Sequence, residues 1–372
     1  PPEIAPRAQL EGALDRVVQR ALGAVATHLQ GHAHNRLLSQ PPLFEAYREF
    51  IAGSELYDVD YPEAVRHLER AVAIDPGFVS AQLRLAMGYR ILGRDEEAVG
   101  IVRQLVRRRE SLTDFERLWV DCFDAWFADR TEERLRLLRE IGRQVPDDTT
   151  VTYLIASTAL RLNRPHEARQ VAQSLGQAPE WMARAPMTAN FYAVRAEAEH
   201  RVGAFAEELR VARDGLQHFP SQLRLREAEL RALAAMGDRA GIAGVLAAAQ
   251  TSTLSNPSRF RPALAAAAAA RAHGHPELAE ELAAGVGAEL GDELQPDGDP
   301  ELLWAAARAL AHAGELARAQ GRLEELRRGH PGFNPFAVAA WLGAVAARRG
   351  EMGAAENPEA ELATAEGAPP AG

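Results

Sequence analysis

The side chains that most often perform chemistry are scarce in this chain of 372 residues. Its 42 residues counted as lysine or arginine are all arginines, which excludes chemistry that needs an ε-amine, such as a Schiff base or a P-loop lysine on a phosphate. A single cysteine, Cys122, excludes an intramolecular disulfide and a multi-cysteine zinc site. Because Asp121 and Asp124 lie beside it and would raise the pKa of its thiol, we expect Cys122 to pack in a core rather than act as a nucleophile.

Histidines and neighbouring carboxylates also lack the spacing of a catalytic or metal site. The H-x-H pairs at residues 32–34 and 273–275 have no third zinc ligand close in sequence, and no H-E-x-x-H motif occurs. Pairs of glutamates, such as those at 96–97 and 207–208, stand where helices are expected to begin, and acidic residues stabilise that end of a helix. We therefore predict a protein that is not an enzyme, with no catalytic residue, no metal and no cofactor.

The composition indicates helices and argues against nucleic acid as a partner. A hydrophobic content of 47% with only 6% aromatic residues, rich in alanine and leucine, is typical of an all-α protein. The net charge of −10 disfavours binding to phosphates, and no uncharged apolar stretch reaches the roughly 20 residues that a membrane span needs. No signal peptide is visible, but the start at Pro1 rather than methionine favours an exported or cell-surface location.

A repeat of about 34 residues organises the chain. Ala64 and Ala98 lie 34 residues apart in similar segments, as do Gly203 and Gly237 after two helical runs. A proline follows the reference position by twelve residues in three segments, for example Pro76 after Ala64, and proline there would end a helix. Each unit is thus predicted to be a helix, a glycine-containing turn, a second helix and a proline stop.

This spacing predicts the domain organisation. Residues 1–42 form an amphipathic helix over 7–30 and a linker, 43–355 form an array of helix pairs, and 356–372 form a tail rich in alanine, proline, glycine and glutamate. We expect eight units, and a ninth that is cut short, with starts near residues 45, 79, 115, 149, 189, 223, 260, 300 and 336.

The best-preserved unit resembles a known family. Leu85, Ala86, Tyr89, Gly93 and Ala98 match the signature positions of the tetratricopeptide repeat (TPR). This resemblance implies an all-α, right-handed α-solenoid of stacked helix-turn-helix repeats that binds a protein or peptide. Residues 43–176 resemble more narrowly the TPR regions of bacterial signalling proteins, although this chain has no kinase glycine loop.

The resemblance also implies a binding face, because set positions of the first helix in each TPR unit line the concave surface. The residues at those positions, which we predict to bind a partner, are Met87, Arg90, Trp119, Phe123, Trp126, Phe127, Tyr153, Arg161, His200 and Arg201. Aromatic and arginine side chains are the residue types most often found at binding hot spots. The alternative interpretation is that the aromatic residues simply fill the core between units.

Two classes of function remain open from the sequence. The first is a non-enzymatic scaffold that binds a protein partner through its concave surface and ends. The second is a structural subunit that associates with copies of itself into a ring, fibre or tube, because the shortened ninth unit leaves a face for the N-terminal helix of the next copy. A further alternative is a regulatory TPR segment of a bacterial signalling protein.

Overall fold

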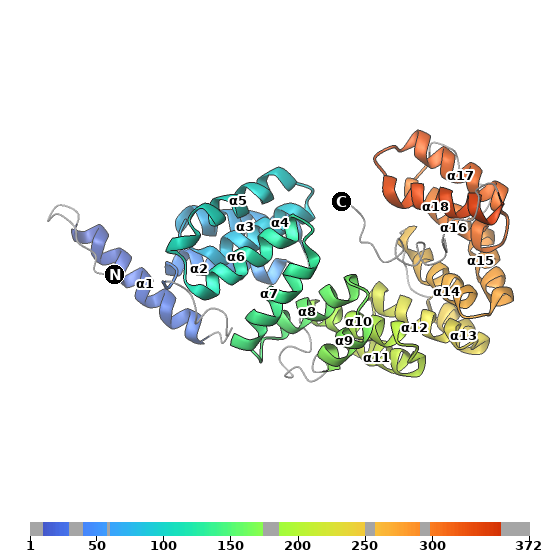
Figure 1. Ribbon diagram of the computed structural model, residues 1–372, viewed down its shortest axis with the longest axis horizontal. Helices are drawn as coiled ribbons and strands as arrows, with labels where there is room; N and C mark the ends of the chain where they lie inside the picture. Colours follow the sequence, from blue (N-terminus) through green and yellow to red (C-terminus); the bar gives the residue numbers. More distant parts are fainter. Residues whose placement is uncertain are drawn as a thin grey trace. The chain divides into compact units, whose positions relative to one another are not determined.

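A computed structural model describes residues 10–29, 40–57, 60–173, 186–249, 257–290 and 298–350 of the chain. These residues form eighteen α-helices and no strand, which confirms the predicted all-α class (Figure 1). The chain divides into two compact units, Pro1–Val194 and Arg195–Ala371, and the division falls inside one helix.

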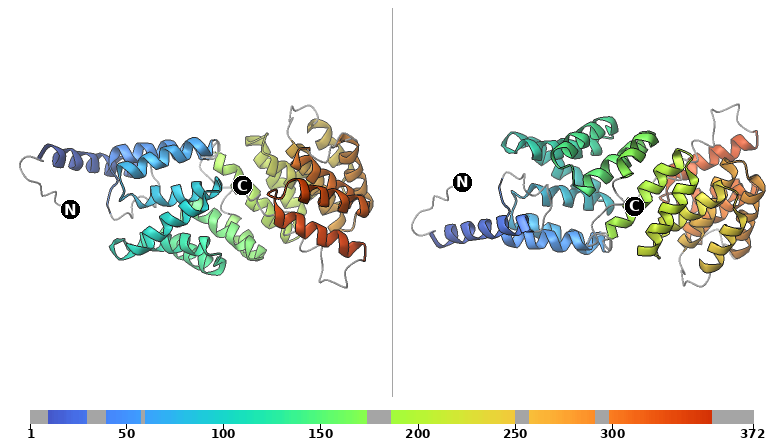
Figure 2. Two further views of the ribbon diagram at one scale, coloured as in Figure 1. Left: turned by 90° about the horizontal axis from the view of Figure 1, so that it is seen from above. Right: turned by 90° about the horizontal axis from the view of Figure 1, so that it is seen from below.

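The first unit is built from helices that pack in successive pairs, as the further views in Figure 2 show. Its helices are α1 (Leu10–Leu29), α2 (Phe44–Leu56), α3 (Tyr61–Ile74), α4 (Val79–Ile91), α5 (Asp95–Arg107), α6 (Asp114–Phe127), α7 (Thr131–Gln144), α8 (Thr149–Arg161), α9 (Pro165–Ala172) and the first part of α10 (Pro186–Arg201).

The second unit continues the same alternation of helices. It contains the rest of α10 and then α11 (Phe205–His218), α12 (Leu223–Ala235), α13 (Arg239–Ala249), α14 (Arg261–Ala272), α15 (Pro276–Leu290), α16 (Pro300–His312), α17 (Leu316–Gly329) and α18 (Pro335–Arg348). The nine predicted unit starts lie within three residues of the observed starts of α2, α4, α6, α8, α10, α12, α14, α16 and α18. The predicted domain limits at residues 42 and 355 stay predictions, since 30–39 and 351–372 lie outside the described residues.

From α4 onward, the turn that follows the first helix of each pair depends on one residue with a positive φ angle. Glycine holds this left-handed conformation after six of the first helices, at residues 93, 203, 237, 274, 314 and 350, with φ between 70° and 85°. The predicted glycine turns are therefore confirmed. In two pairs the residue is Asp129 or Asn163, both with φ of 53°, because these short polar side chains tolerate the left-handed region better than other non-glycine residues. A search for glycine alone does not find them.

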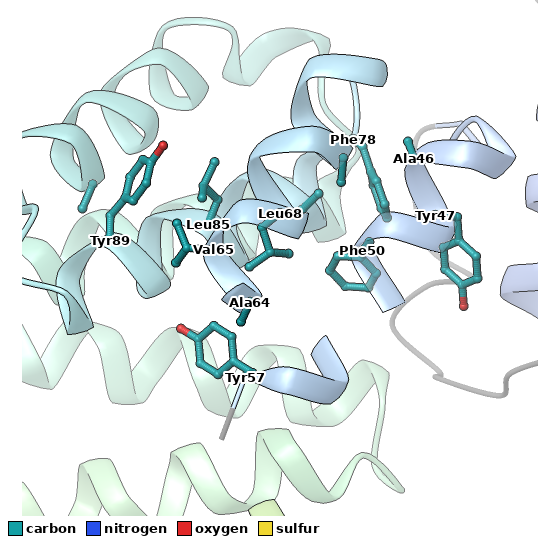
Figure 3. Close-up of a cluster of buried hydrophobic side chains, with 13 residues drawn as sticks. Ala46, Tyr47, Phe50, Tyr57, Ala64, Val65, Leu68, Phe78, Leu85 and Tyr89 are labelled. Atoms are coloured by element: carbon teal, nitrogen blue, oxygen red, sulfur yellow. The ribbon is translucent and has the colours of Figure 1, made fainter. Parts of the chain in front are cut away.

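The core of the first unit lies between the helices of neighbouring pairs (Figure 3). Leu68 and Leu85 lie in its middle, and Phe50 and Phe78 pack at one end with ring centroids 5.0 Å apart. Ala64 is fully buried at the point where α3 meets α2, and a side chain at Gly53 would collide with the Ala64 carbonyl. The two helices of the pair thus approach closely because small residues, Gly53 and Ala64, occupy the contact point.

This contact point recurs as the fourth residue of every second helix. The residues there are Ala64, Ala98, Arg134, Ala168, Glu208, Ile242, Ala279 and Ala319. All five alanines are completely buried. Two of the eight positions carry a charge instead, Arg134 in the first unit and Glu208 in the second, and these two positions are where the packing of the repeat departs from its own rule.

Candidate functional site

Arg134 of α7 is held against a tryptophan of the preceding helix. Its guanidinium carbon lies 4.7 Å from the centroid of the Trp126 ring on α6. Arg90 of α4 approaches the same ring at 5.2 Å and the neighbouring Phe127 ring at 5.0 Å. Two cations from different helices therefore stack on one aromatic pair, an arrangement that stabilises each charge through the ring electrons.

The arginines of this cluster carry no compensating carboxylate. Among the described residues, no Asp or Glu lies within ion-pair distance of Arg90, Arg134 or Arg161. Burial lowers the pKa of Arg134, and the positive charge of Arg161 lowers it further. The Nε–H of Arg134 is buried and donates no hydrogen bond to a partner within the described part of the chain. We call Arg90, Trp126, Phe127, Arg134 and Arg161 the arginine–tryptophan surface.

The aromatic row on α6 serves both the core and this surface. Trp119 and Phe123 are half-buried and pack against a core cluster that includes Leu83 and Val120. The ring of Phe123 lies 5.7 Å from that of Trp126, which in turn lies 5.1 Å from Phe127. Phe127 packs against the core cluster that contains Leu85 and Tyr89, so three of the four rings support the core, whereas Trp126 contacts two cations.

Two other predicted binding residues of the first unit also contribute to packing. Met87 is half-buried against the core shown in Figure 3. Tyr153 of α8 packs with its ring 5.6 Å from Phe191 of α10. Arg161, at the end of α8, is exposed.

The remaining predicted residues, His200 and Arg201, belong to a charged network in the second unit. Its centre is Glu208, which is fully buried. One carboxylate oxygen of Glu208 accepts a hydrogen bond from Nε of Arg231 at 2.7 Å, and the other lies 2.7 Å from Nδ1 of His200. Arg201 donates from Nε to Glu197 at 2.6 Å, and Arg231 also pairs with Glu197.

Charges in this network neutralise one another. Burial by itself would raise the pKa of Glu197, but the charges of Arg231 and Arg201 outweigh it and hold the pKa at about 2. Burial would lower the pKa of Arg231, and the charges of Glu197 and Glu208 raise it instead. His200 and Arg201 are therefore already engaged inside the second unit, whereas Arg90 and Arg134 have no such partner among the described residues.

Arg134, Glu208 and Arg231 were not among the predicted site residues. Arg134 and Glu208 could have been identified because each replaces alanine at the fourth position of the second helix. A charge at a close contact between helices loses water and needs a compensating partner. Arg231 carries no comparable signal, because it lies in the first helix of its pair, where charged residues are common.

Cys122 lies in the core, as predicted, with 2% of its surface exposed. Burial raises the pKa of its thiol to about 11, and Arg134 opposes this rise only in part. The expected cause was different, because Asp121 and Asp124 are paired instead with Arg109 and Arg130. Cys122 occupies on α6 the small-residue position that Ala86 fills on α4.

The described residues hold no group of three or more His, Cys, Asp or Glu side chains placed to bind a metal ion. His273 stacks on Phe205 with ring centroids 4.6 Å apart. The other H-x-H pair, His32 and His34, lies outside the described residues. Within the same ranges, every helix is too short or too polar to cross a bilayer.

Comparisons with known proteins concern the fold. No protein-family model and no curated protein sequence matches the chain. Similar solved structures include a tetratricopeptide repeat protein from Parabacteroides merdae, with 13% identity and a TM-score of 0.41 over 72% of this chain and 99% of that one. The Cut9–Hcn1 hetero-tetramer of the APC/C has 11% identity and a TM-score of 0.48 over 80% of this chain and 55% of that one.

A third similar structure is the TPR domain of P58(IPK), with 13% identity and a TM-score of 0.29 over 82% of this chain and 98% of that one. The chain resembles tetratricopeptide repeat proteins in its scaffold of stacked helix pairs. None of these likenesses assigns a role to an individual residue, so the functional argument depends on the contacts within this chain.

Proposed function

We propose that the chain is a non-enzymatic scaffold and that the arginine–tryptophan surface of its first unit binds a protein partner. The observation that carries this proposal is the stacking of Arg90 and Arg134 on Trp126 with no carboxylate from the described residues to neutralise them. A partly buried cation without a carboxylate beside it can still bind one that another molecule supplies.

The chemistry of the surface indicates what such a partner carries. Guanidinium groups bind carboxylates through two parallel hydrogen bonds, and rings supply apolar contact area beside them. Arg90 is prepositioned by its stacking on Trp126 and Phe127, so little side-chain freedom is lost on binding. We therefore expect a peptide or helix with acidic and aromatic or aliphatic side chains next to one another.

A second arginine, Arg94, lies four residues after Arg90 and supplies the control. Arg94 also stacks on an aromatic ring, with its guanidinium carbon 3.9 Å from the Tyr89 centroid. Unlike Arg90, it is paired with Glu69 at 3.1 Å and with Glu97 at 2.6 Å. The two side chains thus differ in whether their charge is available, and not in their residue type or their aromatic contact.

The test begins with selection of peptides from a displayed random library on the purified chain. The selected sequences should be enriched in Asp and Glu beside aromatic or aliphatic residues, and their affinity can be measured by fluorescence anisotropy. Trp126→Ala should weaken the best peptide by about 30-fold, the size of a typical hot-spot loss. Peptides that bind Trp126→Ala as tightly as the unchanged chain would remove this surface as the binding site.

Self-association is the second candidate function, and a specific observation favours it. The first helix of the chain presents an apolar face that its own unit does not cover. That surface is separate from the arginine–tryptophan surface, so either proposal can fail without the other.

A further inference from the structure

The N-terminal helix α1 exposes the apolar side of its amphipathic pattern. Six apolar side chains that lie along one stripe are between 45% and 77% exposed: Leu14, Val17, Val18, Leu22, Val25 and Leu29. The sequence predicted an amphipathic helix here, and the structure confirms the helix over Leu10–Leu29. The usual arrangement, in which the apolar side covers the core, is reversed.

The opposite side of α1 makes the contacts with the first unit. Arg20 pairs with the buried Asp75 at 2.6 Å, and Oε1 of Gln19 accepts a hydrogen bond from the backbone N–H of Glu45 at 3.1 Å. A Cβ at Gly23 would collide with the carbonyl of Pro42, so glycine is required for this approach. Within the described ranges of the chain, the apolar stripe is therefore left exposed, because the opposite face, which is polar and carries small residues, attaches α1 to the first unit.

We propose that this stripe pairs antiparallel with the same stripe of a second copy, so that two chains form a dimer around a two-fold axis near Ala21 and Leu22. This inference goes beyond the proposed partner binding and does not depend on it. About such an axis, Leu14 of one copy lies opposite Leu29 of the other, and Val18 opposite Val25. A stripe whose residue types repeat when it is reversed is self-complementary, which is what a two-fold interface requires.

The distribution of charge along α1 selects the antiparallel direction. Two exposed acidic residues, Glu11 and Asp15, lie near the N-terminus, and the exposed His28 lies near the C-terminus. The exposed Arg16 lies on the side of the helix away from the stripe. Parallel pairing would bring the acidic ends of two copies together. Antiparallel pairing separates them, places each near the other copy's His28, and aligns the helix dipoles favourably.

The exposed area is sufficient for a modest dimer. Burial of six side chains that are about half exposed removes roughly 400–500 Å² per copy, or on the order of 1,000 Å² in total, which is the lower limit for a specific interface. A hollow of about 370 Å³, lined by residues that include Ala26, Phe44 and Ile51, lies between α1 and α2 and adds apolar surface beside the stripe.

Mass as a function of concentration tests the dimer. Sedimentation equilibrium on the full chain should show a reversible rise from 40.4 kDa to twice that mass. Leu22→Glu combined with Val25→Glu should raise the dissociation constant at least 100-fold, since it places charges in the centre of the stripe. Both side chains are exposed in one copy, so the variant should keep the helix content of the unchanged chain.

The control is Phe336→Glu on α18. Phe336 is 85% exposed and would be central to a head-to-tail contact between the two ends of the chain. The proposal expects this variant to dimerise normally. A chain that stays at 40.4 kDa at every concentration overturns the proposal, and so does loss of association in Phe336→Glu but not in the α1 variant.

Cross-linking tests the direction of pairing. Under oxidation, a mixture of Leu14→Cys and Leu29→Cys chains should form mixed disulfide dimers, whereas Leu14→Cys alone should form few. Cys122 does not interfere, because it is 2% exposed. Efficient self-linking of Leu14→Cys, with no mixed product, would indicate parallel helices and overturn the antiparallel dimer.

Discussion

Two helix pairs of this protein break the same packing rule in opposite ways. Where the other six pairs place a buried apolar residue, alanine in five of them and Ile242 in one, α7 places Arg134 and α11 places Glu208. Glu208 is surrounded by Arg231 and His200, which satisfy both of its oxygens. Arg134 is stacked on Trp126 without a carboxylate from the described residues. A charge at this helix contact is thus neutralised within the fold in the second unit, whereas in the first unit it is stacked on an aromatic ring and is proposed to bind a partner.

The strongest test of this contrast is removal of the buried carboxylate. Glu208→Ala should lower the free energy of unfolding of the second unit by about 3–5 kcal/mol, because Arg231 loses the fully buried one of its two carboxylate partners. Hydrogen exchange across α10–α12 would measure the loss locally. Glu97→Ala, which breaks an exposed ion pair with Arg94, should cost less than about 1 kcal/mol. Equal losses in the two variants would show that Glu208 has no special role.

The next largest effect should be a loss of stability of the second unit in acid. The pKa of Glu197 in the folded chain is about 2, below its ordinary value of 4.5. Its contribution of about 3 kcal/mol is therefore present in full above pH 4.5 and is lost as the pH falls toward 2. Exchange in α10–α12 should accelerate over this range, and Glu197→Gln should flatten the profile. A profile unchanged by Glu197→Gln would mean that the network does not stabilise the unit.

Arg134 should behave differently from Glu208 when its charge is removed. Arg134→Met keeps the length of the side chain and leaves no carboxylate unpaired, so the free energy of unfolding should change by less than about 1.5 kcal/mol. Binding of the selected acidic peptides should weaken by about 10-fold, since one cation of the arginine–tryptophan surface is lost. A stability loss as large as that of Glu208→Ala would show that Arg134, like Glu208, stabilises the fold.

The smallest expected effect concerns Cys122, which reports on the packing between α6 and α7. With its pKa raised to about 11 and its surface buried, the thiol should react with a disulfide reagent at pH 8 only at the rate at which the chain opens. Arg134→Met should leave this protection within about threefold if packing is retained. Immediate labelling of the unchanged chain would show that this helix pair is open in solution.

The architecture was largely predictable from the sequence, because local signals determine it. Glycine turns, proline stops and the spacing of Ala64 and Ala98 placed every helix pair. The turns at Asp129 and Asn163 were not predicted, because residues other than glycine can also adopt a positive φ angle.

The proposed binding surface was predictable only in part. Arg90, Trp126 and Phe127 were placed correctly on neighbouring helices, but their contact with Arg134 depends on how α4, α6 and α7 pack, which spacing does not encode. The sequence pattern also did not predict that the apolar stripe of α1 faces outward. It is determined by Arg20, whose partner Asp75 lies 55 residues away in the sequence.

The affinity of one selected peptide for two arginine variants, four residues apart, distinguishes a charge that is available for binding from one that is already paired. Arg90→Ala and Arg94→Ala each remove a guanidinium group stacked on an aromatic ring, but only Arg94 has carboxylate partners among the described residues. The account predicts that Arg90→Ala weakens binding about 10-fold or more while Arg94→Ala changes it less than about twofold. Equal affinities in the two variants, or a larger loss in Arg94→Ala, would contradict it.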